Sequence, residues 1–162
     1  MFKKVLLPID GSPLATQAAT QGIAFAKAIG AMVVSVYVAV KSPVFSFDTV
    51  GDAPTKHEFD TMVKAAADKA AAPVREAAKA AGIPLTERSC SAVSASKSIV
   101  AVAKDTGCDL IYMASRGNSG WDKLLMGSVA AKVLAESPIP VLIYKTSEKE
   151  LPKNYWAYST EI

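Results

Sequence analysis

Apolar runs of strand length recur along the chain and alternate with longer segments of helical periodicity. Four of the runs are continuously apolar or β-branched, as is typical of strands covered on both faces of a sheet. A fifth run alternates between apolar and polar residues, which indicates a strand that is less buried. In chain order the predicted strands are 5–9, 32–40, 85–90 (the alternating run), 109–113 and 141–144.

The segment that follows the first strand predicts a helix over 13–29. Ser12 is a good N-cap, Pro13 occupies the first helical position, where a missing N–H costs nothing, and Gly30 suits the C-cap. The residues on the expected core face are small, so we expect this helix to lie close to the sheet. They are Ala15, Ala19, Gly22, Ile23 and Ala26.

Three further helices are predicted. Thr55 and Glu58 have the spacing of a capping box, so a helix is expected over 57–81, with Pro73 either kinking it or starting a second piece. The other two helices are expected over 94–106 and 129–135.

Regular alternation of strands and helices with short connections predicts a doubly wound α/β domain with a parallel sheet. We assign residues 1–146 to this single domain and 147–162 to a polar C-terminal tail that contains Tyr155, Trp156 and Tyr158. The segment 41–54, with two prolines and two phenylalanines, is predicted to be a long loop that serves as a lid or a contact surface.

The amino-acid composition argues against several classes of function. The chain has 162 residues, 51% of them hydrophobic and 20% charged, with a formal net charge of +3. Basic residues are scattered among acidic ones, which argues against a nucleic-acid partner. The N-terminal apolar run is too short for a signal sequence or a membrane span, so we expect a cytoplasmic protein with no membrane partner. Cys90 and Cys108 match neither a disulfide framework nor a metal knuckle, and we interpret them as buried free thiols.

The candidate chemistry lies in the stretch Ala114-Ser115-Arg116-Gly117, followed by nine residues and then Gly127-Ser128. This loop joins a buried strand to a helix, which is where α/β folds bind ligands. Glycines allow a ligand close to the backbone, and a helix N-terminus favours an anion such as phosphate. The hydroxyls of Ser115 and Ser128 can add donors, and Arg116 can pair with a phosphate.

Asp10 follows the first strand. If the first and fourth strands are neighbours at a topological switch point, Asp10 faces the same crevice, where it can hold a ribose hydroxyl or a divalent cation. By spacing alone the phosphate signal is weak, and glycines needed for packing are the alternative explanation.

The order of residues in this stretch resembles the nucleotide signature of the universal stress protein family, Gly-x-x-Gly, nine residues, then Gly-Ser/Thr. The similarity extends over nearly the whole chain as far as Lys145. It implies a sheet of order 3-2-1-4-5, a homodimer formed through the last strand, Val141 to Tyr144, and binding of ATP, with Mg or Mn as the accompanying metal.

Carried over residue by residue, the resemblance implies three groups of contacts. Pro8, Ile9 and Asp10 would contact adenosine and ribose, with Asp10 also the metal ligand, and the backbone of Val38 would meet the adenine. The nucleotide would be lined by Met113, Ala114, Arg116 and Gly117, and its phosphates held by Gly127, Ser128 and Val129.

Two positions depart from the family pattern, because Ala114 replaces the first glycine of the signature and Ala130 replaces a frequent Thr or Ser. A methyl group at Ala114 would crowd the ligand or disfavour a positive φ. Since alanine is the smallest such change, we expect nucleotide binding to survive.

The leading hypothesis is therefore an ATP-binding regulatory module of the stress response that acts on an unidentified protein partner without efficient catalysis. The sequence offers no general base, since its only histidine, His57, falls at a predicted helix start. Two alternatives stay open: a slow metal-dependent ATPase or phosphotransferase that uses Asp10, and a dimeric stress module that binds no nucleotide. Without a ligand, Arg116 is expected to be exposed to solvent.

Overall fold

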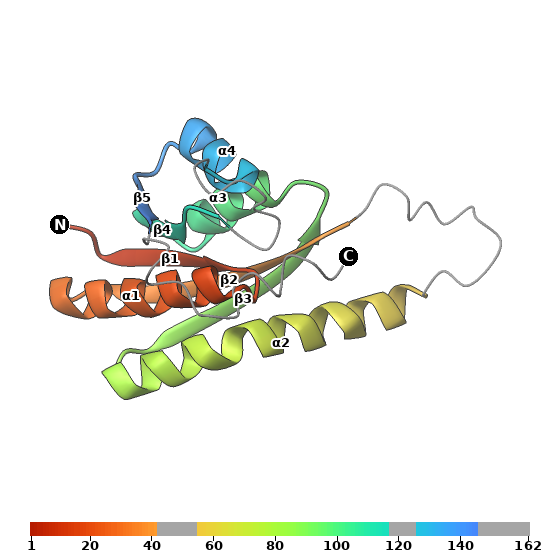
Figure 1. The fold of residues 1–162 in the computed structure, drawn as a ribbon, viewed down its shortest axis with the longest axis horizontal. Coiled ribbons are helices and arrows are strands. Elements are labelled where there is room, and N and C mark those ends of the chain that lie inside the picture. Colours follow the sequence, from red (N-terminus) through yellow and green to blue (C-terminus); the bar gives the residue numbers. More distant parts are fainter. Residues whose placement is uncertain (42–54, 117–125, 146–162) are drawn as a thin grey trace.

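The computed structural model describes residues 1–41, 55–116 and 126–145, which form a five-stranded parallel sheet with two helices on each face (Figure 1). The strand order is β3-β2-β1-β4-β5. Both the fold class and the order 3-2-1-4-5 expected from the sequence are therefore confirmed. The elements are β1 (Lys4–Ile9), α1 (Pro13–Ile29), β2 (Met32–Val40), α2 (Lys56–Ala81), β3 (Leu85–Ala92), α3 (Ala95–Asp105), β4 (Leu110–Ala114), α4 (Ser128–Glu136) and β5 (Val141–Tyr144).

The predicted element boundaries agree with these to within two residues. The loop 41–54, apart from Lys41, and the tail 147–162 lie outside the described residues. The division into a domain of residues 1–146 and a tail of residues 147–162 therefore stays a prediction. None of the described helices is long and apolar enough to cross a membrane.

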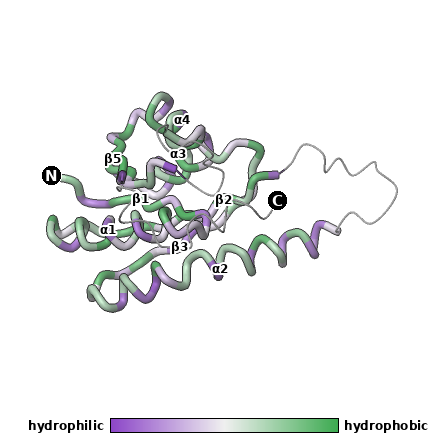
Figure 2. The backbone as a smooth tube through the Cα atoms, in the orientation of Figure 1, coloured by the Kyte–Doolittle hydropathy of each residue, from purple (hydrophilic) through white to green (hydrophobic). Residues whose placement is uncertain are grey.

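Side chains of the strands alternate between two hydrophobic layers, and the apolar strands stand out in Figure 2. Helices α1 and α2 cover one face, where they bury Leu7, Ile9 and Tyr112. Helices α3 and α4 cover the other face, where they bury Leu6 and Met113. Because both faces are covered, the inner strands have no polar face, and this explains their continuous apolar sequence.

Helix α1 begins and ends where the sequence predicts. Ser12 Oγ accepts a hydrogen bond from the Ala15 amide at 3.2 Å, and Gly30 closes the helix with φ +70°. All five residues of the predicted core face are buried. A Cβ atom on Gly22 would lie 2.6 Å from Leu7 Cδ2 and 3.2 Å from Tyr112 Cδ1. The absence of a side chain at this position therefore sets how closely α1 approaches the sheet.

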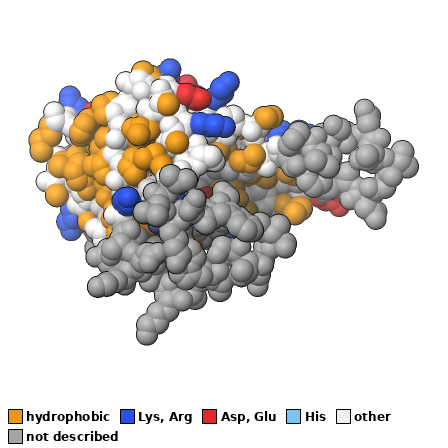
Figure 3. Space-filling view, turned by 45° about the horizontal axis from the view of Figure 1, so that its top comes forward, with side chains coloured by type: hydrophobic (Ala, Val, Ile, Leu, Met, Phe, Trp, Pro, Cys, Tyr) orange, Lys and Arg blue, Asp and Glu red, His pale blue; other side chains and the backbone are white. Residues whose placement is uncertain are grey.

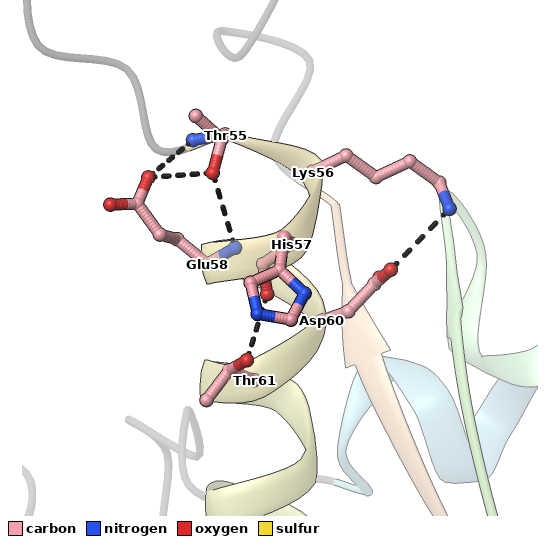
Figure 4. A network of polar contacts seen from close by, with 6 residues as sticks. All are labelled: Thr55, Lys56, His57, Glu58, Asp60 and Thr61. Atoms are coloured by element: carbon pink, nitrogen blue, oxygen red, sulfur yellow. Dashed lines mark hydrogen bonds and ion pairs between the residues drawn. The ribbon is translucent and has the colours of Figure 1, made fainter.

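Helix α2 starts with the predicted capping box (Figure 4). Glu58 Oε2 accepts from the Thr55 amide at 2.7 Å, and Thr55 Oγ1 accepts from the Glu58 amide at 3.3 Å. These hydrogen bonds to Thr55 hold the pKa of Glu58 below its ordinary value. The helix neither ends nor restarts at Pro73, which lies on its exposed side. The carbonyl that Pro73 leaves without a donor belongs to the exposed Lys69, where water can satisfy it.

A polar clamp joins β1 and β4 at the amino edge of the sheet. The Asp109 carboxylate accepts from the backbone amides of Lys3, at 2.8 Å, and Lys4, at 2.9 Å, and Lys4 Nζ donates to the Thr106 carbonyl at 2.8 Å. Desolvation raises the pKa of Asp109, but these amide bonds outweigh it and hold the pKa below its ordinary value. The clamp fixes the ends of β1 and β4 that lie opposite the candidate site.

Both cysteines are free thiols, as expected. Cys108 is buried, whereas Cys90 on the edge strand β3 is half-buried, because α3 and α4 do not fully cover that strand. Burial raises the pKa of both thiols. The neutral form that this favours is a poor nucleophile.

Substitution of Gly22 by valine tests the close approach of α1 to the sheet. We expect Gly22→Val to lower the free energy of unfolding by about 2 kcal/mol, since the added atoms overlap Leu7 and Tyr112 in a packed core. The matched control is Ala24→Val, on the exposed side of the same helix, which should cost less than about 1 kcal/mol. Urea denaturation measures both, and equal losses for the two variants would contradict the packing argument.

Candidate functional site

The carboxyl edge of the sheet opens between β1 and β4. These two strands are neighbours, as the switch-point argument requires, but their ladder pairs only Val5 with Leu110 and Leu6 with Ile111. By contrast, β1 pairs with β2 along its whole length. Each of the two strands continues beyond the short ladder, to Ile9 and to Ala114. Pro8 has no N–H to donate, which ends the ladder early. The chain leaves β1 toward α1 on one face and leaves β4 toward α4 on the other, so the opening lies between these two connections, where doubly wound folds bind ligands.

On the β1 side of this opening, Asp10 forms a tight turn. Its Oδ1 accepts from the Ser12 amide at 2.9 Å, and Gly11 between them has φ +81°. This left-handed conformation favours glycine. The turn leads directly into the Ser12 cap of α1, so the position of Asp10 is fixed from both sides.

On the β4 side, Gly127 packs against the backbone at the end of β4. Its amide donates to the Ser115 carbonyl at 2.8 Å. A Cβ atom on Gly127 would lie 3.2 Å from Arg116 Cα and 3.3 Å from the Ser115 oxygen. Gly127 is therefore needed for packing whether or not a ligand binds, and its substitution would disturb Ser115 and Arg116 as well.

The amino terminus of α4 has no side-chain cap. In α1, α2 and α3 the N-cap side chain accepts a backbone amide hydrogen, whereas at Gly127 no described side chain does so, and the first turn of α4 has no acidic residue. The first N–H groups of α4 and its helix dipole therefore remain available to an anion.

Ser115 supplies a second, independent sign of a ligand at this place. Its side chain is 5% exposed, and its Oγ has no hydrogen-bond partner in the described part of the chain. A buried hydroxyl without a partner is destabilising, and such groups in native structures usually have a reason. Its carbonyl already binds Gly127 at the start of α4, so the hydroxyl and the uncapped amides belong to one small region.

The alanine that replaces the signature glycine is accommodated without strain. Ala114 is a strand residue, and its side chain packs with Leu14, Ala15 and Ala18 of α1. The preceding residue, Met113, packs on the opposite face with α3 and α4. The Ala114 methyl group thus occupies the core beneath α1, and the extended backbone requires no positive φ. A ligand on the face where Met113 lies would therefore not meet the Ala114 methyl group.

The structure places ten of the eleven predicted site residues, and Gly117 lies outside the described residues. Asp10 and Pro8 are half-buried at the end of β1, Ile9 is buried, and Val38 is half-buried near the end of β2. Ser128 and Val129 form the exposed first turn of α4. Ile9 packs on the α1 and α2 face, while Val38 and Met113 pack on the other.

Arg116 corrects one expectation. We expected its side chain to be exposed in the absence of a ligand, but the residue is only 7% exposed. It comes two residues after the end of β4, and its backbone lies close to Gly127. Ser115, which was predicted only as an additional donor, proves to be the more informative residue, and its burial could not be read from the sequence.

The arrangement suits an anion better than a metal held by protein alone. In the described residues no group of three or more His, Cys, Asp or Glu side chains could hold a metal ion. A single carboxylate such as Asp10 fits the way Mg²⁺ is often bound, through one or two carboxylates together with substrate phosphates. The buried Ser115 hydroxyl and the α4 amides fit a phosphate group.

Comparison with protein families gives one match over most of the chain. The model of the universal stress protein family matches residues 1–145. Among curated relatives, universal stress protein MJ0531 of Methanocaldococcus jannaschii is 31% identical over 150 residues, which cover 93% of this chain and 86% of that protein.

Solved structures agree with this result. The structure of protein MJ0577, from the same organism, superposes with a TM-score of 0.73 at 25% identity, covering 91% of this chain and 99% of that one. A universal stress protein in complex with cAMP superposes with a TM-score of 0.64 at 25% identity, covering 90% and 99% of the two chains.

Removal of the Ser115 hydroxyl tests whether it is unpartnered in the ligand-free protein. We expect Ser115→Ala to leave the free energy of unfolding unchanged or to raise it by up to about 1 kcal/mol, because a buried group without a partner is lost. The control is Ser12→Ala, which removes the cap of α1 and should cost about 1 kcal/mol. Thermal unfolding without nucleotide measures both, and a loss at Ser115 as large as that at Ser12 would show that its hydroxyl has a partner.

Proposed function

The chain belongs to the universal stress protein family, and from this premise we propose that it binds an adenine nucleotide, ATP in the first place, at the carboxyl edge between β1 and β4. In this proposal the bound nucleotide sets the state of a regulatory module that acts in the stress response through a protein partner. The cytoplasmic location expected from the sequence stays a prediction.

The observation that carries the proposal is that the buried Ser115 hydroxyl, which has no described partner, lies in the same small region as the uncapped amino terminus of α4. Both groups can donate hydrogen bonds, and no described side chain accepts from them. A phosphate oxygen would accept from both at once, and the helix dipole favours its negative charge. The exposed Ser128 and Val129 in the first turn of α4 leave that end of the helix open to a ligand.

The other proposed contacts are those to the ribose, the cation and the adenine, and they come from residues at the carboxyl ends of β1, β2 and β4. Asp10, fixed by its turn, would accept a hydrogen bond from a ribose hydroxyl or hold a divalent cation, Mg or Mn, that neutralises phosphate charge. Pro8 would contact the adenosine, the backbone of Val38 would meet the adenine, and Met113 would line the nucleotide. Support for an adenine nucleotide also comes from the cAMP complex of a universal stress protein with the same fold.

A regulatory role is favoured over catalysis because general acid-base chemistry lacks an evident residue. The only histidine of the sequence, His57, lies in the exposed first turn of α2, where Figure 4 shows it beside the capping box. Asp10 is the one carboxylate among the predicted contacts. Hydrolysis is therefore expected to be slow.

Nucleotide binding can be tested by calorimetry with ATP, AMP and cAMP, each with and without Mg²⁺. We expect ATP to bind, and Ser115→Ala to weaken it about tenfold, because one hydrogen bond to a charged phosphate is lost. The control is Ser98→Ala, a half-buried serine on α3, which should bind ATP as the parent does.

Two outcomes would count against the proposal in different ways. If no adenine nucleotide binds, and none is found by mass spectrometry in gently purified protein, nucleotide binding itself is wrong. If ATP binds equally well to the parent and to Ser115→Ala, the protein does bind ATP, but the phosphates do not contact the Ser115 hydroxyl.

We also propose that the chain forms a homodimer through β5. This strand lies at one end of the sheet and pairs with β4 on one side, so its outer N–H and C=O groups can pair with a second copy. Exposed hydrophobic side chains of α4 lie beside it, with Leu134 48% and Val129 37% exposed. Figure 3 shows hydrophobic side chains gathered at the side of the molecule where Figure 1 places α4 and β5.

A charged residue introduced into this surface tests whether it forms the dimer interface. We expect the parent to be dimeric at micromolar concentration in light scattering, and Leu134→Glu to raise the dissociation constant at least tenfold, since the carboxylate would be desolvated at the interface. The control is Val93→Glu, at 79% exposure beside the opposite edge strand β3, which should remain dimeric. A monomeric parent, or equal effects of the two variants, would overturn this interface.

A further inference from the structure

A second site lies on the other face of the sheet, under α2, and we propose that it binds a small organic cation with a primary ammonium group. A cavity of about 90 Å³ lies between α2 and the strands β1, β2 and β3. Its wall includes Ile9, but neither Asp10 nor Ser115 belongs to it. The proposal is therefore independent of nucleotide binding.

The register of the strands explains which side chains enter the cavity. Ile9, Tyr37 and Ser89 form one row across the sheet. Ser35 and Glu87 form a second row, two residues closer to the amino edge. Both rows face α2, since Ile9 and Tyr37 pack in that layer. Small residues of α2, Ala67 and Ala71, form the opposite wall, and their short side chains leave the space open.

Ser35 is the sign that the cavity serves a polar ligand. It interrupts a strand made mostly of valines, Met32–Val40, and is 1% exposed. Its side chain lines the cavity, and none of the hydrogen bonds seen among the described residues involves its hydroxyl. A valine here would continue the strand pattern and narrow the cavity. A buried hydroxyl facing a cavity needs a partner inside it.

The charges at the mouth favour a cation. Asp68 and Glu87 both line the cavity. Arg75 binds Glu87 with two hydrogen bonds, Nε to Oε1 at 2.7 Å and Nη2 to Oε2 at 2.8 Å, so the three groups together carry a net negative charge. Arg88 also borders the cavity, but strand alternation directs its side chain to the face away from Glu87 and Ser89.

Size and donor pattern narrow the class of ligand. The cavity, of about 90 Å³, exceeds the roughly 10–15 Å³ that a single water molecule needs and has room for an ammonium group with a short carbon chain. Such a group donates three hydrogen bonds, and the cavity offers oxygen acceptors on Ser35, Ser89 and Asp68. The ring of Tyr37 adds an aromatic surface that attracts a cation.

The test is a titration of the full chain with ethylammonium chloride at constant ionic strength, followed by two-dimensional NMR of the backbone amides. We expect saturable shifts centred on Ser35, Tyr37 and Ala71, and none of them with ethanol at the same concentrations. Ser35→Val narrows the cavity and removes its hydroxyl, so it should abolish the saturable shifts, while Asp68→Asn should weaken binding at least fivefold.

The control is Asp105→Asn, an exposed carboxylate on α3, which should bind ethylammonium as the parent does. Asp68 is exposed, so its variant is expected to fold, and the dispersion of the same spectra reports the folding of Ser35→Val. Absence of saturable shifts, equal shifts with ethanol, or unchanged binding by Ser35→Val or Asp68→Asn would each overturn the proposal and leave a cavity that holds water alone.

Discussion

The unequal pairing of the central strand is the constraint on which the rest of the structure depends. β1 pairs with β2 over six positions but with β4 over only two. At the amino edge, Asp109 ties the starts of β1 and β4 together through the amides of Lys3 and Lys4. Toward the carboxyl edge Pro8 has no N–H to continue the ladder, and the chain leaves β1 and β4 toward opposite faces, so an opening lies between the Asp10 turn and the end of β4. The candidate site follows from this difference between the two edges.

Side-chain capping is complete at the amino ends of α1, α2 and α3 but not at this opening. Ser12, Thr55 and Ser94 cap their helices, and Gly30 and Gly82 end two of them in the left-handed conformation. At α4 the cap position holds a glycine that provides no side-chain bond, and the nearby Ser115 hydroxyl is buried without a described partner. Sequences that fold well satisfy such local rules, and exceptions concentrate at functional sites. The two exceptions at one place are therefore more informative than either alone.

The two faces of the sheet divide the molecule into two regions. On the α3 and α4 face, Val38 and Met113, two of the predicted nucleotide contacts, pack in the hydrophobic layer. On the α1 and α2 face, close packing at Gly22 contrasts with the open space that Ala67 and Ala71 leave under α2. Ile9, the residue before Asp10, belongs to the wall of that second cavity. The end of β1 thus borders both regions, although different side chains serve each.

The sequence alone determined the elements and their order, because strand and helix periods, caps and breakers are local signals: Ser12, Gly30 and the Thr55 capping box fixed helix ends directly. It also predicted the candidate site at Asp10 and the stretch from Ala114 to Ser128. Only the tertiary structure decided which face each side chain occupies and what surrounds it. That is why the Ala114 methyl proved to lie under α1, Arg116 to be enclosed rather than exposed, and Ser115 to be buried without a described partner. Burial depends on contacts between segments far apart in the chain, and no local pattern encodes them.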